Sequence, residues 1–307
     1  MNRAYIDTVR VLLDVAPFVF ESPQFAMKGG TALNLFVQDL PRLSVDIDVV
    51  YVEHTPDRTT ALRDIATNLS ATKVAIERLG YTATILPTRA GDEAKMLVAT
   101  ATAQVKVEVN FVFRGTLLPV TTKSLTPATQ ELFTTDIRVP LLETAEMYGS
   151  KLVAAMDRQH PRDIYDVQQM LNTFGLPPQY VDCFVAYLAG HNRPIHEVLF
   201  APPRPLASMF ENAFSGMTRE PVNVDSLIST QQQLLETLPS ALTTSHRQFL
   251  LSLARAEPQW DLMPFAHLHL LPAIRWKLLN LEKLKQQNPK RFDAQHHELA
   301  RAFDALP

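Results

Sequence analysis

The feature that most constrains the fold is a change of pattern near residue 140. Before that point, short runs of alternating apolar and polar residues are interleaved with helical segments, as in a mixed α+β sheet protein. From Leu141 onward, the apolar spacing is almost wholly helical and is punctuated by prolines. We therefore expect an α+β domain at residues 1–125 and an all-helical domain at residues 126–307, with the boundary in a Thr- and Pro-rich stretch.

Composition excludes several classes of protein. With 307 residues, of which 46% are hydrophobic and 20% charged, the chain is long and apolar enough for about two globular domains. A net charge of -3 excludes a strongly basic protein held to nucleic acid by charge alone, although a local basic patch remains possible. The single cysteine, Cys183, excludes an intrachain disulfide and, with no signal peptide visible, favours a cytoplasmic protein. No uncharged apolar run approaches the ~20 residues of a membrane span.

Two acids stand one residue apart inside an apolar strand-like run at residues 43–52. Because side chains alternate along a strand, Asp46 and Asp48 should project from the same face. Two carboxylates at this spacing can hold Mg²⁺ or Mn²⁺, hard cations that prefer oxygen ligands. The alternative is a pair of acids on a solvent-facing strand edge, but the apolar flanks make two neighbouring like charges costly without a cation.

A third carboxylate would come from a neighbouring strand, and Glu108 is the best candidate. It lies in the strand-like run of residues 105–113 and shares a face with Lys106. Three carboxylates could hold two metal ions that activate a hydroxyl and neutralise phosphate charge. The alternative is a Glu–Lys pair on the surface of the sheet.

A glycine pair precedes the two acids and offers a place for an anion. Gly29 and Gly30 let the backbone approach a phosphate closely, and a helix that begins near Thr31 would add unpaired N–H groups. The hydroxyl of Thr31 could cap that helix or reach a phosphate oxygen. Lys28 precedes the glycines instead of following them, so the pattern differs from a P-loop, and an ordinary turn remains the alternative.

A second charged motif follows in the helical half. Lys151 should lie at the edge of the buried face of an amphipathic helix, where its ammonium group could reach a phosphate; a solvated lysine is the alternative. Asp163 and Asp166 are three residues apart on the next helix and share a face, although helix capping alone could explain Asp163. Arg158 and Arg162 flank these acids and could keep them ionised or contact phosphate.

The region from Arg275 to Arg301 has a clear excess of positive charge. Such a helical tail could guide an RNA acceptor stem onto a catalytic face, and a solvated helix face is the alternative.

Taken together, the two motifs resemble one known family. Residues 27–35 (MKGGTALNL) and 42–49 (RLSVDIDV) are similar to the first motif of the AbiEii/AbiGii-type nucleotidyltransferase toxins, of the DNA polymerase β-like superfamily. Residues 148–152 (YGSKL) and 158–166 (RQHPRDIYD) resemble the K…RDxxD block of that family. The resemblance covers about residues 20 to 175 and implies a nucleotidyltransferase fold, a mixed sheet with flanking helices, followed by a helical bundle.

The resemblance also implies roles for individual residues. Asp46 and Asp48 would be the metal ligands, Lys151 would meet the triphosphate, and Asp163 would be an essential acid near the nucleotide. With Glu108 as a possible third ligand, we expect these five residues to form the catalytic set. The expected nucleotide-binding set consists of Lys28, Gly29, Gly30, Thr31, Lys151, Arg162 and Asp166.

The expected activity is metal-dependent transfer of a nucleoside monophosphate from an NTP to a hydroxyl acceptor. Family members are usually encoded beside an antitoxin, and mycobacterial relatives add pyrimidine nucleotides to the tRNA acceptor end, so a tRNA 3′ end is the expected acceptor. A small-molecule, antibiotic-type nucleotidyltransferase and a catalytically inactive nucleotide-binding module are the alternatives.

Overall fold

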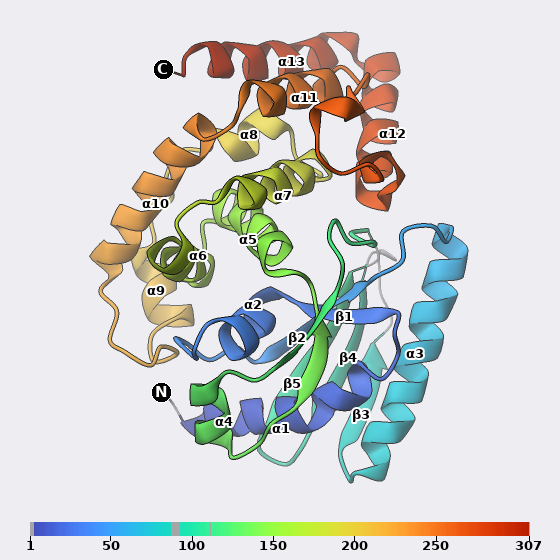
Figure 1. Ribbon diagram of the computed structural model, residues 1–307, viewed down its shortest axis with the longest axis vertical. Helices are drawn as coiled ribbons and strands as arrows, with labels where there is room; N and C mark the ends of the chain where they lie inside the picture. Colours follow the sequence, from blue (N-terminus) through green and yellow to red (C-terminus); the bar gives the residue numbers. More distant parts are fainter. Residues whose placement is uncertain (1–2, 87–92, 111, 307) are drawn as a thin grey trace. The chain divides into compact units, whose positions relative to one another are not determined.

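The computed structural model describes residues 3–86, 93–110 and 112–306. The chain divides into two compact units, coloured along the sequence in Figure 1. Unit 1 comprises Met1–Met147 and Ser215–Pro221, and unit 2 comprises Tyr148–Phe214 and Val222–Pro307.

In the described residues, unit 1 is built on a mixed seven-stranded sheet with the strand order β3-β4-β5-β2-β1-β7-β6. The strands are β1 (Phe25–Lys28), β2 (Asp46–Tyr51), β3 (Thr82–Leu86), β4 (Glu93–Ala99), β5 (Gln104–Asn110), β6 (Thr121–Ser124) and β7 (Arg138–Leu141). At the centre, β2 pairs parallel with β5 and antiparallel with β1. Strands β4 and β5 are neighbours in the chain and form an antiparallel hairpin.

The sheet of unit 1 is completed only by β7. Met27 of β1 pairs with Leu141 of β7, and β7 in turn pairs with β6. A short segment from much later in the chain also joins unit 1. Thr218 forms an isolated bridge with Arg42, and the Leu43 N–H donates to the Met217 carbonyl oxygen at 2.8 Å.

The helices of unit 1 are α1 (Arg3–Val19), α2 (Gly29–Ala32), α3 (Arg58–Arg78) and α4 (Pro127–Phe133), and a π-helical turn, η1 (Leu33–Val37), continues α2. The sequence places the start of α2 near Thr31, but the helix begins two residues earlier, at Gly29. Helices α1 and α3 pack against each other and against the sheet (Figure 1).

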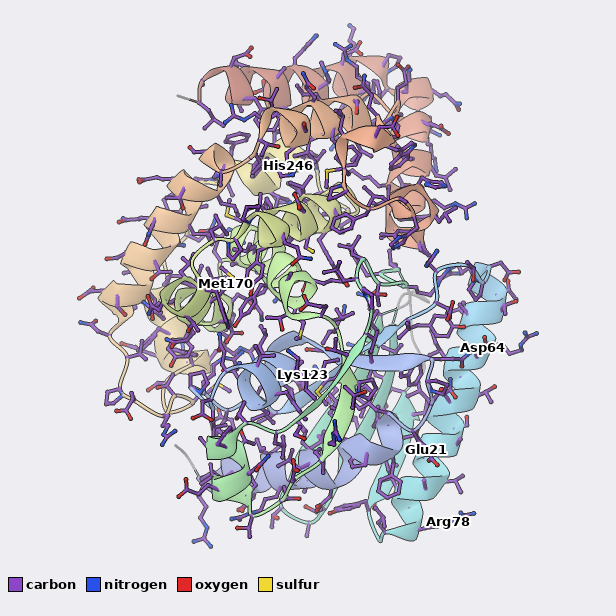
Figure 2. The ribbon with its side chains drawn as sticks, in the orientation of Figure 1. Glu21, Asp64, Arg78, Lys123, Met170 and His246 are labelled. Atoms are coloured by element: carbon purple, nitrogen blue, oxygen red, sulfur yellow. The ribbon has the colours of Figure 1, made fainter. Side chains whose placement is uncertain are left out.

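The two faces of the sheet differ in chemistry because side chains alternate along β2. Ile47, Val49 and Tyr51 are fully buried, and the Tyr51 hydroxyl donates to Asp64 of α3 at 3.0 Å (Asp64 is labelled in Figure 2). This bond identifies the apolar face as the one that α3 covers. Asp46 and Asp48 therefore project from the opposite, polar face.

Unit 2 is helical, as the sequence predicts. Helix α5 (Thr144–Arg158) begins in unit 1 and continues into unit 2. The remaining α-helices are α6 (Pro161–Phe174), α7 (Pro178–Ala189), α8 (Ile195–Leu199), α9 (Ala207–Ala213), α10 (Val224–Ser240), α11 (Thr244–Ala254), α12 (Pro272–Gln287) and α13 (Pro289–Asp304), with 3₁₀ turns η2 (Trp260–Leu262) and η3 (Leu268–Leu270). A bond of 2.8 Å between His246 of α11 and Asp182 ties α11 to α7 (His246 is labelled in Figure 2). The mixed sheet with flanking helices, followed by a helical region, confirms the predicted fold class.

Candidate functional site

The acid pair and the glycine pair of unit 1 lie side by side. Gly29 has φ +77°, a left-handed conformation that favours glycine, and a Cβ at this position would lie 2.0 Å from Oδ2 of Asp48. The carboxylate of Asp48 thus occupies the space that a side chain at residue 29 would need. Two separate constraints therefore require glycine at residue 29: the left-handed backbone conformation and the close approach of the Asp48 carboxylate.

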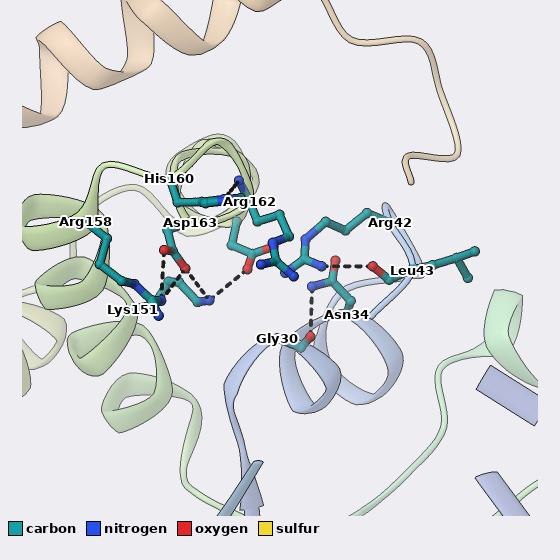
Figure 3. A network of polar contacts seen from close by, with 10 residues as sticks. Gly30, Asn34, Arg42, Leu43, Lys151, Arg158, His160, Arg162 and Asp163 are labelled. Carbon is teal, nitrogen blue, oxygen red and sulfur yellow. Dashed lines mark hydrogen bonds and ion pairs between the residues drawn. The ribbon is translucent and has the colours of Figure 1, made fainter. Parts of the chain in front are cut away.

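Gly30 makes room for a second side chain, one to which the sequence analysis assigned no role. A Cβ on Gly30 would lie 2.8 Å from Nη2 of Arg42 and 2.9 Å from Oγ of Ser44. Arg42 is only 3% exposed and donates from Nη1 to the Leu43 carbonyl oxygen at 2.9 Å (Figure 3). A buried guanidinium therefore lies against the glycine pair, a favourable charge for an anion. In the sequence, Arg42 could have been noticed because it begins the run of residues 42–49 that resembles the first motif of the family.

Thr31 performs a task that neither sequence interpretation foresaw. Its side chain is fully buried, and its hydroxyl donates to the backbone carbonyl oxygen of Asp46. The hydroxyl therefore does not cap α2, whose N-cap is Lys28, and it is bonded within the fold instead of being directed at a ligand. This bond ties the first turn of α2 to the strand that carries the acids.

The register of the sheet places the charged residues of four strands in one row. Asp48 of β2 lies between Lys28 of β1 and Glu108 of β5, and Glu108 lies between Asp48 and Lys95 of β4. In the adjacent row, Asp46 is paired with Lys106. We call Asp46, Asp48, Lys95, Lys106 and Glu108 the sheet-face cluster.

Within the sheet-face cluster, Glu108 is bound by lysines. Its Oε1 lies 2.7 Å from Nζ of Lys95 and 3.3 Å from Nζ of Lys106. Partial burial alone would raise the pKa of Glu108, but the two ammonium groups outweigh it and hold the pKa below its ordinary value. The Glu–Lys pair that the sequence allowed as an alternative is therefore present, with a second lysine that the sequence did not anticipate.

Unit 2 contains a second cluster of four residues, Lys151, Arg158, Asp163 and Asp166, whose lysine and two acids are almost fully buried. Nζ of Lys151 lies 3.0 Å from Oδ1 of Asp163 and 3.0 Å from Oδ2 of Asp166, and Nη2 of Arg158 lies 2.8 Å from Oδ2 of Asp163 (Figure 3). The side chains of Lys151, Asp163 and Asp166 are 9%, 6% and 0% exposed. We call these four residues the helix cluster. Lys151 is thus not the solvated lysine of the alternative interpretation.

The electrostatics of the helix cluster favour ionised acids. Burial would raise the pKa of Asp163, but Lys151 and Arg158 together lower it below its ordinary value. The first turn of α6 is capped by His160, whose Nδ1 accepts from the Arg162 N–H at 3.1 Å (Figure 3). Capping is therefore carried out by His160, and the Asp163 carboxylate binds Lys151 and Arg158.

A glycine that the sequence analysis left without a role fixes the position of the helix cluster. A Cβ on Gly149 of α5 would lie 2.5 Å from Cβ of Cys183 and 2.7 Å from the carbonyl carbon of that residue. Helices α5 and α7 therefore approach so closely that only glycine fits two residues before Lys151. Cys183 is fully buried, as expected of a packing residue.

The positively charged region from Arg275 to Arg301 lies on α12 and α13, and its lysines differ in how far they are exposed. Lys277 is 6% exposed, and its ammonium group donates to the Arg193 carbonyl oxygen at 2.6 Å. Burial lowers the pKa of Lys277 to about 8. The exposed positive charges on these helices are carried by Arg275, Lys283, Lys285, Lys290, Arg291 and Arg301. The positive excess therefore rests on the exposed residues and not on Lys277.

Two properties of the described residues bear on metal ions and membranes. Within the described ranges, no group of three or more His, Cys, Asp or Glu side chains is placed so as to hold a metal ion. Across those same ranges, every helix is too short or too polar to span a bilayer.

Comparisons with known proteins agree with both motifs. A family described as "Nucleotidyl transferase AbiEii toxin, Type IV TA system" matches residues 10–280. Among solved structures, MenT4, a nucleotidyltransferase toxin from Mycobacterium tuberculosis H37Rv, has a similar fold with a TM-score of 0.61 and 16% identity, over 90% of this chain and 93% of that chain. Comparison with curated protein sequences finds no match. The family match spans most of the chain, so this protein belongs to the AbiEii nucleotidyltransferase toxin family of type IV toxin–antitoxin systems.

Proposed function

We propose that this nucleotidyltransferase moves a nucleoside monophosphate from an NTP to the 3′ end of an RNA, with tRNA as the acceptor. Family membership implies an NTP substrate and an antitoxin partner, and nucleotidyltransferases generally use divalent metal ions. The observation that carries the proposal is the contact between Asp48 and Gly29, which brings an acid that suits a hard cation next to backbone that suits a phosphate.

The donors on the polar face fit a divalent ion. Asp46 and Asp48 supply carboxylate oxygens from one face of β2, and magnesium or manganese would complete its shell with water and substrate phosphates. Such an ion, when bound, neutralises charge on the α-phosphate and on the leaving pyrophosphate. Asp46 and Asp48 hold it and fix its place on the sheet.

The chain's own residues then position the triphosphate for in-line attack by the acceptor hydroxyl. Backbone N–H groups at Gly29 to Thr31 approach the phosphates, and the buried guanidinium of Arg42 adds positive charge beside Gly30. By the family resemblance, Lys151 contacts the triphosphate. Lys28 and Arg162 are proposed to contact the nucleotide as well, and Asp163 and Asp166 hold Lys151 in position. Catalysis is then mainly positioning and charge neutralisation.

An RNA acceptor is favoured by the exposed positive charges on α12 and α13. Arg275 and Lys283 on α12, with Lys290 and Arg291 on α13, are all exposed and suit a phosphate backbone. A cytoplasmic location agrees with such a substrate.

The test supplies each of the four α-³²P-labelled NTPs with total RNA and, in parallel, with a panel of hydroxyl-bearing antibiotics. Label at the 3′ end of tRNA supports the proposal. Label only on an antibiotic supports a small-molecule enzyme, and no label with any acceptor supports an inactive nucleotide-binding module. Charge-reversal variants Lys283→Glu and Arg291→Glu should weaken RNA labelling and its salt dependence without changing NTP affinity.

A further inference from the structure

The lysines of the sheet-face cluster stand where a second metal ion would be expected. Two-metal sites hold their ions about 3.5–4 Å apart and share carboxylates between them. In this chain the group between two carboxylates is an ammonium. Nζ of Lys106 lies 3.3 Å from Oε1 of Glu108 and 3.9 Å from Oδ1 of Asp46.

Lys95 completes this arrangement from the other side of Glu108. Its Nζ lies 2.7 Å from the same Oε1, so that one carboxylate oxygen accepts from two ammonium groups. The register fixes both neighbours, because Lys95 pairs with Glu108 across β4 and β5, and Lys106 precedes Glu108 by two residues on the same face. A divalent ion between Asp46 and Glu108 could bind only in place of the Lys106 ammonium group.

Charge counting leads to the same conclusion. Two divalent ions would bring about four positive charges to the acids and the triphosphate. One divalent ion together with the ammonium groups of Lys95 and Lys106 brings the same total. The side chains of Lys95, Lys106 and Glu108 are 36%, 36% and 22% exposed, and both ammonium groups lie within 3.3 Å of Oε1 of Glu108.

We infer that this enzyme uses one divalent ion, held by Asp46 and Asp48. Lys106 and Lys95, both positioned by Glu108, supply the charge of a second ion, and Lys106 takes its position. Glu108 is then a positioning residue for lysines and not a metal ligand. This inference rests on the proposed function, since it requires that Asp46 and Asp48 bind the ion.

The test counts bound Mn²⁺ by electron paramagnetic resonance, with the full chain saturated by a non-hydrolysable α,β-methylene NTP. Wild type and Glu108→Gln should each bind about one Mn²⁺ per chain. Lys106→Met frees Asp46 and Glu108 and should raise the count to about two. The double variant Lys106→Met with Glu108→Gln should return it to about one, because the new site needs Glu108.

A matched control comes from α3 of the same unit. Lys73 is paired with Glu77, and its side chain is 34% exposed, close to the 36% of Lys106. Lys73→Met should leave the count at about one. Because both ion pairs are partly exposed, neither substitution should unfold the protein, and both variants can be counted in the folded state.

Three results would overturn the inference. Two ions in wild type with one in Glu108→Gln would make Glu108 a metal ligand while leaving the proposed function intact. An unchanged count in Lys106→Met would show that Lys106 does not occupy an ion position. No bound ion in wild type would remove the proposed metal-dependent function as well, and RNA labelling would then fail in the same preparation.

Discussion

The two charged clusters of this protein contain the same kinds of residue in opposite environments. In the sheet-face cluster, the side chains of Asp46, Lys95, Lys106 and Glu108 are 22% to 36% exposed. In the helix cluster, the lysine and both acids are at most 9% exposed. Exposed ion pairs contribute little to stability, while breaking a buried pair leaves an uncompensated charge. The comparison teaches that substitutions in the sheet-face cluster should change chemistry, and substitutions in the helix cluster should also change the fold.

The largest effect on stability is expected from the helix cluster. Lys151→Met leaves the buried carboxylates of Asp163 and Asp166 without their shared ammonium partner, so the free energy of unfolding should fall by about 3–5 kcal/mol. Chemical denaturation measures this change. The control is Lys106→Met in the sheet-face cluster, which should lose no more than about 1 kcal/mol. Equal losses for the two lysines would break the comparison.

The contact between Gly29 and Asp48 can be tested with two alanines. Gly29→Ala strains a backbone with φ +77° and forces the Asp48 carboxylate to move, so nucleotidyl transfer should fall by about 100-fold. Gly80→Ala is the matched control, because Gly80 has φ +89° with no heavy atom within 4 Å of its added Cβ. Both variants should lose about 1 kcal/mol of stability from strain. If Gly80→Ala also abolished transfer, displacement of Asp48 would not be the cause.

A second buried lysine sharpens the contrast, because Lys277 donates to a neutral carbonyl oxygen and not to a carboxylate. Its pKa of about 8 in the folded state lies below the ordinary 10.5, so the unfolded state binds more protons between these values. Stability should therefore rise with pH through this window, by roughly 3 kcal/mol at most. Unfolding of wild type and Lys277→Met, compared from pH 7 to pH 10.5, isolates the effect. A difference between the two proteins that does not change with pH would contradict it.

The smallest effect is expected at the exposed edge of the helix cluster. Arg158 pairs with Asp163, but its side chain is 62% exposed. Because Lys151 still neutralises Asp163, Arg158→Met should lower the free energy of unfolding by less than about 1 kcal/mol. A loss as large as that of Lys151→Met, in the same denaturation assay, would show that burial does not govern these pairs.

Local periodicity predicted the parts of the site that depend on neighbours in sequence. Asp46 and Asp48 are two residues apart on a strand and therefore share one face of the sheet. Asp163 and Asp166 are three residues apart on a helix and therefore share a face, on which both contact Lys151. The change from mixed to helical pattern also predicted the fold class correctly, because hydrophobic periodicity determines which elements form.

What the sequence could not predict depends on contacts between distant segments. Lys95 reaches Glu108 only through the register of a hairpin, and Arg42 reaches Gly30 only through the tertiary fold. The return of residues 215–221 to unit 1 rests on a few backbone bonds that leave no periodic signal. The pairing of β7 with β1, a strand far earlier in the chain, likewise leaves no local signal in the sequence.

The most direct test of the account is the Mn²⁺ dependence of nucleotide transfer by wild type and Asp48→Asn. Asparagine keeps the shape of the side chain beside Gly29 and removes the charge that holds the ion. The account predicts that the variant folds normally but transfers label at least about 1,000-fold more slowly at every Mn²⁺ concentration. Transfer at the wild-type rate by the folded variant would contradict the central claim that the polar face of this sheet is the site of catalysis.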